Sequence, residues 1–400
     1  MRTSESNAKA NRSKIRREYR RLVVDLSVLH KKDAGTGIQR VVGNVWSELR
    51  LLERQSLEIV AVAAGPDNLF RYIPSDFFES RGSGEYSRIA GPYEPQAGDL
   101  FFGLDFSPVM LPRCYRTVKR WKNLGIPVCV VVYDLLPWSN PEWFTWRGAR
   151  NFRRWLSFVR SHVDHAFCIS AAVADELRKA LPHRGLRRLY RQDRSIGIDL
   201  MRLGTDFQEF SGRATQPAVL AGLEGRPIIL MVGTVEPRKG YDIALEIAEK
   251  TCSGEHGPVL VIVGKPGWKT GELQRRLTSH LLVGKSLFWI SDADDAQLAW
   301  LYENSAVFLS TTRGEGFGLP LAEAMSYGLQ VVAPDIPVFR EFDGTGIAFY
   351  TAGQVDEASE LLRSTLVPVS TPLKEGRQTV SWRDVAANLV NQVMLRDDRR

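Results

Sequence analysis

Long apolar runs are absent from this 400-residue chain. No window reaches the roughly 18 unbroken apolar residues of a membrane-spanning helix, and the N-terminus lacks the apolar core of a secretory signal, so we expect a cytoplasmic protein. Cysteine is scarce as well, because Cys114, Cys129, Cys168 and Cys252 are scattered and form no C-x-x-C pair. This spacing argues against a disulfide framework and against a zinc site, and it predicts reduced thiols.

Nucleic-acid signatures are also missing. The chain has neither zinc-finger spacing nor an RNP-type aromatic run, so its formal net charge of +7 does not by itself indicate a nucleic-acid partner. The same charge fits an anionic lipid surface or a nucleotide-binding cleft.

The composition that is present is that of a globular protein. With 44% hydrophobic and 25% charged residues the chain can bury a large core, and its length favours two domains. Apolar strand-like runs alternate with helical stretches in both halves, which predicts α/β architecture with parallel sheets covered by helices. The expected strands are 22–27, 58–64, 99–104, 128–133, 166–170 and 196–203, then 228–232, 259–263, 287–290, 306–309, 330–333 and 347–350. Helices are expected between them, among others at 37–49, 113–123 and 171–181.

Charge and turn residues divide the chain further. Residues 1–21 carry eight Lys and Arg against two Glu, which predicts a basic mobile tail, either a solubilising arm or a tether to anionic lipid. Small, polar and turn-forming residues mark a hinge before the second half. In order, we expect the tail at 1–21, a Rossmann-like domain at 22–206, the hinge at 207–225, a second Rossmann-like domain at 226–380 and a C-terminal helix at 381–396.

The run 312–325, Thr-Arg-Gly-Glu-Gly-Phe-Gly-Leu-Pro-Leu-Ala-Glu-Ala-Met, is the densest group of chemically distinctive residues. Pro320 suits the first turn of a helix, where its missing N–H costs nothing. Glu315 is therefore expected at a strand-to-helix junction and Glu323 in the first turn of the helix. Gly316 and Gly318 allow close backbone approach, so amide groups at the helix start can face an anion. The alternative is a tight turn with solvated carboxylates.

Two other loops carry chemistry at strand ends. Arg238 and Lys239 follow an apolar strand and provide a planar fork and a point charge for a diphosphate. Asp134 ends the strand 128–133, where ligands of parallel sheets collect. No acidic triplet of the D-x-D kind stands beside the candidate phosphate loop, so we expect no metal.

The Glu-x7-Glu spacing of Glu315 and Glu323, with Gly-Phe-Gly-Leu-Pro between them, resembles the retaining glycosyltransferases of family 4. Residues 233–240, Gly-Thr-Val-Glu-Pro-Arg-Lys-Gly, resemble that family's diphosphate-binding loop. The resemblance runs from about residue 228 to residue 389, where the last helix is similar to one that crosses back to the first domain. It implies the GT-B fold, in which two Rossmann-like, doubly wound parallel-sheet domains face a central cleft, the first on the acceptor side and the second binding the nucleotide sugar.

The resemblance also implies residue roles. Glu323 would hydrogen-bond the ribose, and Glu315 would contact hydroxyls of the transferred sugar. The implied catalytic residues are Glu315, Arg238, Lys239 and Asp134. The implied donor-binding residues are Gly35, Thr36, Gly37, Gly233, Arg238, Lys239, Ser291, Asp292, Glu315, Gly316, Phe317, Gly318, Leu319 and Glu323. Ser291 and Asp292 would lie against the base. No cofactor is expected besides the nucleotide diphosphate sugar as co-substrate.

One position departs from the family's pattern. Relatives often have His-Asp where this chain has Tyr133-Asp134. Tyr133 cannot act as a base near neutral pH without a large pKa shift. The loop 35–37 is similar to the family's first glycine-rich loop, although on its own it also fits a plain turn.

The implied activity is that of a retaining, metal-independent hexosyltransferase with a glycan acceptor. Residues 36–41, 133–135 and 141–144 resemble transferases of bacterial surface polysaccharide assembly, and we favour mannose from GDP-mannose and a lipid-linked acceptor in polysaccharide or O-antigen-type biosynthesis. These residues do not distinguish mannose from rhamnose, fucose or glucose. Two alternatives keep the fold: a nucleotide-sugar epimerase, and a non-catalytic nucleotide-sugar-binding subunit.

The stretch from Trp143 to Val163 interleaves five arginines with aromatic residues. Such a helix can lie in a lipid interface, which would place the protein peripherally on the inner face of the plasma membrane. The alternative is a core helix with a solvated basic face.

Overall fold

The computed structural model describes residues 21–33, 35–52, 57–74, 90–181, 195–205, 213–254, 256–342, 346–366 and 380–394. The expected basic tail lies outside these residues except for Arg21, and so do residues 207–212 of the expected hinge.

The first domain is built on a seven-stranded sheet in the order β3-β2-β1-β4-β5-β6-β7. Its strands are β1 (Arg21–Asp25), β2 (Glu58–Ala64), β3 (Phe70–Tyr72), β4 (Asp99–Gly103), β5 (Val128–Val132), β6 (His165–Cys168) and β7 (Gly197–Leu200). All neighbours pair in parallel except β3, which is antiparallel to β2. The parallel strands confirm the predicted α/β class. The edge strand β3 was missed, because three residues are too few to show a periodic pattern.

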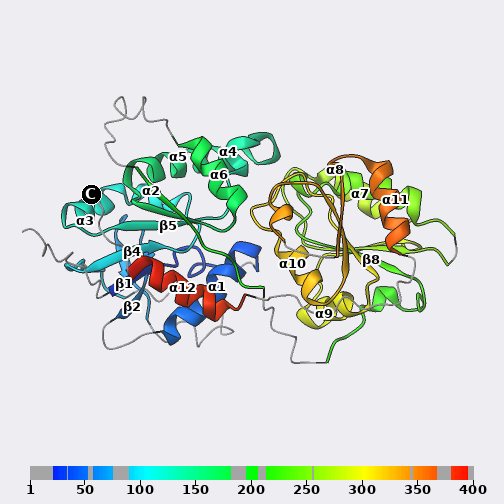
Figure 1. Cartoon of the computed structure of the whole chain (residues 1–400), viewed down its shortest axis with the longest axis horizontal. Coiled ribbons are helices and arrows are strands. Elements are labelled where there is room, and N and C mark those ends of the chain that lie inside the picture. Colours follow the sequence, from blue (N-terminus) through cyan, green and yellow to red (C-terminus); the bar gives the residue numbers. More distant parts are fainter. Residues whose placement is uncertain are drawn as a thin grey trace, which may run out of the picture.

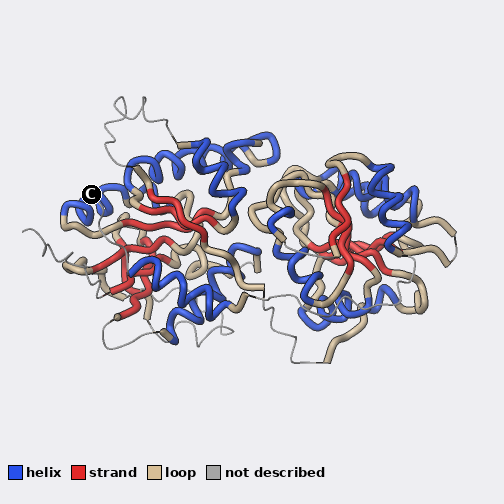
Figure 2. Tube along the Cα trace, viewed as in Figure 1, coloured by secondary structure: helices blue, strands red, loops and turns tan. Residues whose placement is uncertain are grey.

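The second domain carries a six-stranded parallel sheet in the order β10-β9-β8-β11-β12-β13. Its strands are β8 (Ile228–Val232), β9 (Val259–Val263), β10 (Leu287–Ile290), β11 (Val307–Leu309), β12 (Gln330–Pro334) and β13 (Ile347–Tyr350). In both sheets the strand order reverses beside the first strand of the domain, which is where ligands of doubly wound sheets bind. Figure 2 shows the two sheets, each flanked by helices.

Helices cover both faces of each sheet (Figure 1). In the first domain they are α1 (Gly37–Leu51), α2 (Met110–Arg113), α3 (Tyr115–Asn123), α4 (Leu136–Ser139), α5 (Trp146–His162) and α6 (Ala171–Ala180). In the second half they are α7 (Tyr241–Thr251), α8 (Gly271–Ser279), α9 (Asp295–Asn304), α10 (Leu319–Ser326), α11 (Val355–Thr365) and α12 (Trp382–Met394). Among the described residues, no helix combines the length and the apolar character needed to cross a bilayer.

The last helix belongs spatially to the first domain. In Figure 1 the red α12 lies beside the blue α1, although the two are at opposite ends of the sequence. Trp382, Val385 and Leu389 of α12 are buried in the same apolar cluster as strands β1 and β4. The chain therefore crosses between the domains twice.

Local signals set several helix limits. Thr36 caps α1, because its hydroxyl accepts from the amide of Gln39 in a capping box. The helix expected from Trp143 is shorter: residues 141–143 form a separate helical turn, and α5 begins at Trp146 after Thr145, whose hydroxyl accepts from the Gly148 amide at 3.1 Å. The helix expected from Arg113 likewise begins at Tyr115.

Candidate active site

Two loops of the second domain meet where β8 and β11 end side by side. The loop after β8 holds Arg238 and Lys239, and the loop after β11 holds residues 310–318. The Arg238 carbonyl accepts from the Arg313 amide at 2.7 Å and from the Thr312 hydroxyl at 3.1 Å. Gly240 is left-handed, and a Cβ there would lie 2.0 Å from the Thr311 carbonyl oxygen, so the close approach requires glycine.

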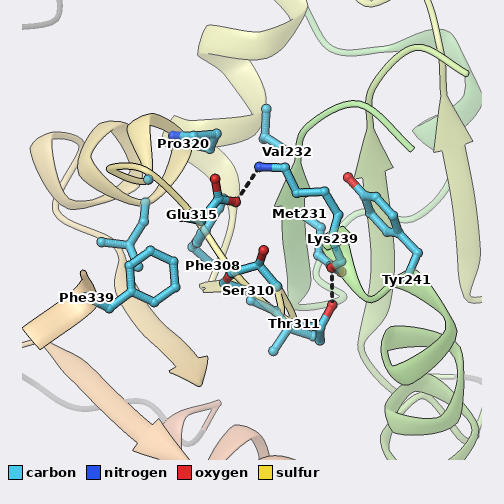
Figure 3. A pocket seen from close by; sticks show the side chains of 14 residues that line it. Met231, Val232, Lys239, Tyr241, Phe308, Ser310, Thr311, Glu315, Pro320 and Phe339 are labelled. Atoms are coloured by element: carbon cyan, nitrogen blue, oxygen red, sulfur yellow. Dashed lines mark hydrogen bonds and ion pairs between the residues drawn. The ribbon is translucent and has the colours of Figure 1, made fainter. Parts of the chain in front are cut away.

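These loops place three of the four implied catalytic residues, Arg238, Lys239 and Glu315, in one ion-pair cluster. Glu315 Oε1 lies 2.5 Å from Lys239 Nζ, and Glu315 Oε2 lies 2.5 Å from Arg238 Nη1. Glu236, for which we expected no role, pairs with Arg238 Nε at 2.6 Å. Its place in the motif two residues before Arg238 was the available signal, but only the fold shows that its carboxylate turns toward the guanidinium. Figure 3 shows Lys239 and Glu315 facing each other in a pocket between β8 and the start of α10.

Burial and charge set the protonation of this cluster. Burial would raise the pKa of Glu315, but Arg238 and Lys239 lower it to about 2. Burial raises the pKa of Glu236, opposed by the same two cations. Burial also lowers the pKa of Lys239, and Glu315 opposes that shift. At neutral pH the cluster thus presents an ionised Glu315 between two cations.

The first domain brings Asp134 close to the loop that holds Glu315, because a Cβ on Gly316 would lie 3.2 Å from the Asp134 Cβ. Burial raises the pKa of Asp134 to about 6, and the charge of Arg238 acts in the opposite direction. The Asp134 carboxylate also accepts from the Leu136 amide at 3.2 Å. A carboxyl with this pKa can exchange a proton near neutral pH.

Tyr133 points away from the cleft. Its hydroxyl donates to the Leu104 carbonyl at 2.7 Å inside the first domain, and burial raises the pKa of the phenol well above its usual value. Only the Tyr133 backbone faces the second domain, because a Cβ on Gly316 would lie 2.0 Å from the Tyr133 carbonyl oxygen. A catalytic base at residue 133 is therefore excluded.

Residues 316–319 of the second domain lie in the contact between the two domains. The Gly316 carbonyl accepts from the Ser170 hydroxyl at 2.8 Å, and Phe317 and Leu319 pack against the apolar cluster of the first domain. A donor contact by Phe317 would therefore come from its backbone. Gly318 is left-handed and precedes α10 without a side-chain cap, which leaves amides at the helix start available to an anion.

Glu323 is buried just after the first turn of α10, in which we expected it. It is the fifth residue of α10 and not part of its first turn, because the helix begins at Leu319. Tyr302 donates to Glu323 Oε2 at 2.7 Å, and Arg40 of the first domain forms an ion pair with Oε1. The sequence motif identified Glu323 as a candidate site residue, but it did not indicate that Tyr302 and Arg40 contact its carboxylate.

The other expected donor residues lie around this centre. A Cβ on Gly37 would lie 3.3 Å from a Leu319 side-chain carbon, so the loop 35–37 reaches the start of α10. A Cβ on Gly233 would likewise lie 3.3 Å from the Lys239 Cε atom. Ser291 and Asp292 are exposed at the end of the edge strand β10, which β9 and β8 separate from β11.

Asp292 and Asp294 form an Asp-x-Asp sequence, but Asp294 caps α9 by accepting from the Gln297 amide at 2.8 Å. In the part of the chain that the structure describes, no group of three or more His, Cys, Asp or Glu is arranged to hold a metal ion.

Comparison with known protein families assigns the second domain. Residues 213–367 match the family described as "Glycosyl transferases group 1". This segment contains both loops of the cluster. The second domain is a glycosyltransferase group 1 domain.

Relatives extend the similarity over the rest of the chain. The serotype-specific mannosyltransferase WbdA of Escherichia coli is 32% identical over 393 residues, which cover 96% of this chain and 46% of that protein. The phosphatidyl-myo-inositol mannosyltransferase of Mycobacterium tuberculosis is 26% identical over 66% of this chain and 66% of its own length. The chain thus spans about half the length of the WbdA proteins that it matches.

Solved structures confirm the fold. Anabaena HepE in complex with UDP and glucose aligns with a TM-score of 0.58 at 15% identity, over 94% of this chain and 95% of that one. OtsA aligns with a TM-score of 0.60 at 11% identity, over 94% and 99%. The glycosyltransferase group 1 domain and the domain before it together form a GT-B fold.

Proposed function

We propose that this chain is a retaining glycosyltransferase that moves a sugar from a nucleotide diphosphate sugar to a glycan acceptor. The observation that carries the proposal is the cluster of Arg238, Lys239 and Glu315 at the junction of the two domains. It lies at the carboxyl ends of adjacent parallel strands, beside uncapped amides at the start of α10, where a phosphate group can be held.

The cluster can supply the main requirement of the reaction. The bond between the sugar's anomeric carbon and the diphosphate oxygen breaks, a bond to the acceptor hydroxyl oxygen forms, and the hydroxyl proton leaves. Arg238, Lys239 and the helix-start amides would meet the charge that develops on the diphosphate, so no metal is required for that purpose. Loss of one such preorganised donor typically costs about 3 kcal/mol of transition-state stabilisation.

The same geometry suggests how Glu315 takes part. Its carboxylate is held by two cations and would contact hydroxyls of the transferred sugar while those cations engage the diphosphate. We do not assign it the nucleophile's role that carboxylates have in retaining hydrolases. Retention is proposed to arise from attack on the face that the diphosphate leaves, with a phosphate oxygen accepting the proton.

The donor and acceptor are proposed from the relatives. WbdA and the mycobacterial protein are both named mannosyltransferases, and WbdA is named serotype-specific. We therefore propose mannose from GDP-mannose, transferred to a growing, lipid-linked glycan of the O-antigen type in the cytoplasm.

Product analysis with a panel of labelled nucleotide sugars tests this proposal. With acceptor, we expect transfer from GDP-mannose, an anomeric proton signal with the donor's configuration, and undiminished turnover in EDTA. Inversion or a strict Mg²⁺ or Mn²⁺ requirement would contradict the mechanism. Formation of an epimerised nucleotide sugar in the absence of acceptor would favour an epimerase. Tight binding of the donor without any product would favour a non-catalytic binding subunit.

Contact with the membrane is a separate part of the proposal. Arg147, Arg150, Arg153 and Arg154 are exposed on α5, which contains no acidic residue, and the Arg150 guanidinium lies 5.2 Å from the ring of the exposed Trp146. Trp155, on the same helix, is buried in the core and cannot enter a lipid interface. Most apolar residues of α5 serve the core, as the alternative interpretation expected.

Vesicle co-sedimentation across a salt series tests this contact. We expect binding to phosphatidylglycerol vesicles at low salt, since each basic residue near anionic lipid contributes about 1 kcal/mol, and release as salt screens the charges. Arg147→Ala/Arg153→Ala should weaken binding, whereas the exposed Leu281→Ala on the other domain should not. Failure to sediment at every salt concentration would favour a soluble acceptor.

A further inference from the structure

Arg40 joins the two domains at Glu323, the carboxylate that the family resemblance implies for ribose binding. It is the fourth residue of α1, directly after the loop 35–37, and its guanidinium pairs with Glu323 Oε1 on α10 of the other domain. The two side chains differ in exposure: Arg40 is 44% exposed and Glu323 only 3%. The domains thus enclose a carboxylate whose countercharge comes from across the seam.

Both Glu323 oxygens have a protein contact and remaining acceptor capacity. A carboxylate offers about four lone-pair sites. Tyr302 uses one at Oε2 and Arg40 faces Oε1, so lone pairs remain for vicinal hydroxyl groups. Tyr302 is held in turn by stacking on Tyr327, with ring centroids 5.1 Å apart. Arg40 therefore leaves acceptor capacity on Glu323 for a ribose.

The physical consequence follows from burial. In this arrangement of the domains Glu323 is buried, and a buried carboxylate without a countercharge is strongly unfavourable. With Arg40 present, closure brings the countercharge at the same moment. Without Arg40, closure would bury an unpaired charge, and the open arrangement would be favoured.

We infer that Arg40 is a positioning residue that couples ribose recognition by Glu323 to closure of the two domains. This rests on the proposed function and deepens it, because it assigns a residue of the acceptor-side domain to nucleotide recognition. The ligand chemistry is a ribose diphosphate, common to GDP and UDP, and does not depend on the base.

Nucleotide binding by calorimetry tests the inference. Arg40→Met should raise the Kd for GDP and for UDP about tenfold, within the usual range of coupling between sites, and Arg40→Lys should restore part of the affinity. Binding of inorganic pyrophosphate, which has no ribose, should change less than about twofold by the same reasoning. Arg50→Met, at an exposed position in the last turn of the same helix, is the matched control and should bind all three ligands as the wild type does.

Two further variants separate coupling from a general effect on closure. In a Glu323→Gln background the neutral amide needs no countercharge. Adding Arg40→Met to that background should therefore raise the Kd for GDP by less than about twofold. Glu341 caps α6 across the seam by accepting from the amides of Ala171 and Ala172 at 2.8 and 2.7 Å, without touching Glu323. Glu341→Gln should therefore leave the ratio of GDP to pyrophosphate affinity unchanged.

The outcomes distinguish the two proposals. Wild-type binding of GDP or UDP together with equal binding by Arg40→Met would overturn the coupling and leave the proposed function standing. Equal losses of affinity for GDP and for pyrophosphate in Arg40→Met would also overturn the coupling. A wild-type protein that binds neither nucleotide would overturn the proposed function and the coupling with it.

Discussion

Glu315 shares its carboxylate between two cations, and Arg238 shares its guanidinium between two carboxylates. Each of these side chains is at least four-fifths buried, so the cluster is a closed set of compensated charges. An entering diphosphate would become a further anion for Arg238 and Lys239, while Glu236 keeps the guanidinium oriented. Function and local stability are therefore linked at these residues.

Arg238→Ala should lower kcat by a factor of about 100 to 1,000, because it removes one preorganised charge donor. It should also lower the free energy of unfolding by about 2 kcal/mol, since Glu236 and Glu315 lose a buried partner. Turnover assays and urea unfolding measure the two effects. Arg178→Ala, which removes an exposed pair with Asp175, is the control and should change neither. Full activity in Arg238→Ala would reject the diphosphate site.

A second acidic group lies inside the first domain, away from the cleft cluster. Asp25 is fully buried at the end of β1, where its carboxylate accepts from the Ser27 amide at 3.0 Å. Burial, with a contribution from Asp105, raises its pKa to about 7. Burial also raises the pKa of Asp105 to about 6, although the amides of Val28 and Leu29 donate to it.

The folded state therefore binds the Asp25 proton more tightly than the unfolded state does, and the free energy of unfolding should fall as pH rises from about 4 through 7. Asp25→Asn should reduce this slope, and it should be more stable than the wild type at pH 8 by at least about 1 kcal/mol. Because the pKa of Asp105 is raised as well, the free energy of unfolding of Asp25→Asn should still fall somewhat as pH rises. Urea unfolding between pH 5 and 8 is the measurement, and parallel pH profiles for the two proteins would contradict the assignment.

The element that connects the two domains at the site is the loop from β11 to α10. Its backbone passes so close to Tyr133, directly after β5, that residue 316 has no room for a side chain. Ser170 at the start of α6 holds the same residue by its carbonyl, and the side chains that follow pack on the first domain. The loop that carries Glu315 is thus positioned by both domains.

Gly316→Ala should oppose this approach, because the new Cβ would lie 2.0 Å from the Tyr133 carbonyl oxygen. We expect kcat/KM to fall about 100-fold, in line with the cost of a small misplacement near the reacting groups. Stability of the second domain should be unchanged. Gly271→Ala at the start of α8, where a Cβ meets nothing within 4 Å, is the control. Equal kinetics for the two variants would show that the contact does not form during turnover.

At the scale of the whole molecule, the chain returns to the first domain with α12. Trp382 fills the space above Gly204, where a Cβ would come within 2.5 Å of the indole ring. The Thr205 amide donates to the Val380 carbonyl at 2.8 Å beside it. Residues from the end of the sequence thus complete a core begun by β1.

Trp382→Ala should destabilise the first domain by about 3 kcal/mol, the cost of removing a large buried aromatic side chain. Hydrogen exchange should show lost protection in α1, which packs against α12, and none in β8 and β9 of the second domain. Trp146→Ala removes an indole that is 70% exposed and should leave exchange unchanged. Loss of protection confined to the second domain would show that α12 stabilises that domain instead.

The sequence by itself determined the two motif loops and the strands other than β3. The ranges 228–232, 259–263, 287–290 and 347–350 agree residue for residue with β8, β9, β10 and β13, because parallel strands covered on both faces are continuous apolar runs. The loops that hold Arg238, Lys239 and Glu315 were recognisable too, because each combines glycines and charged residues directly after an apolar strand. The edge strand β3 has no such signal.

Only the tertiary structure decided which of these side chains meet. The pairing of Arg40 with Glu323, the turn of Glu236 toward Arg238 and the burial of Tyr133 away from the cleft all depend on contacts between segments distant in sequence or on the direction of a side chain. Periodicity and composition report the conformation of neighbouring residues, and they contain no information about which strand ends the fold brings together. That arrangement follows from the order of strands in the two sheets and from the contact between the domains.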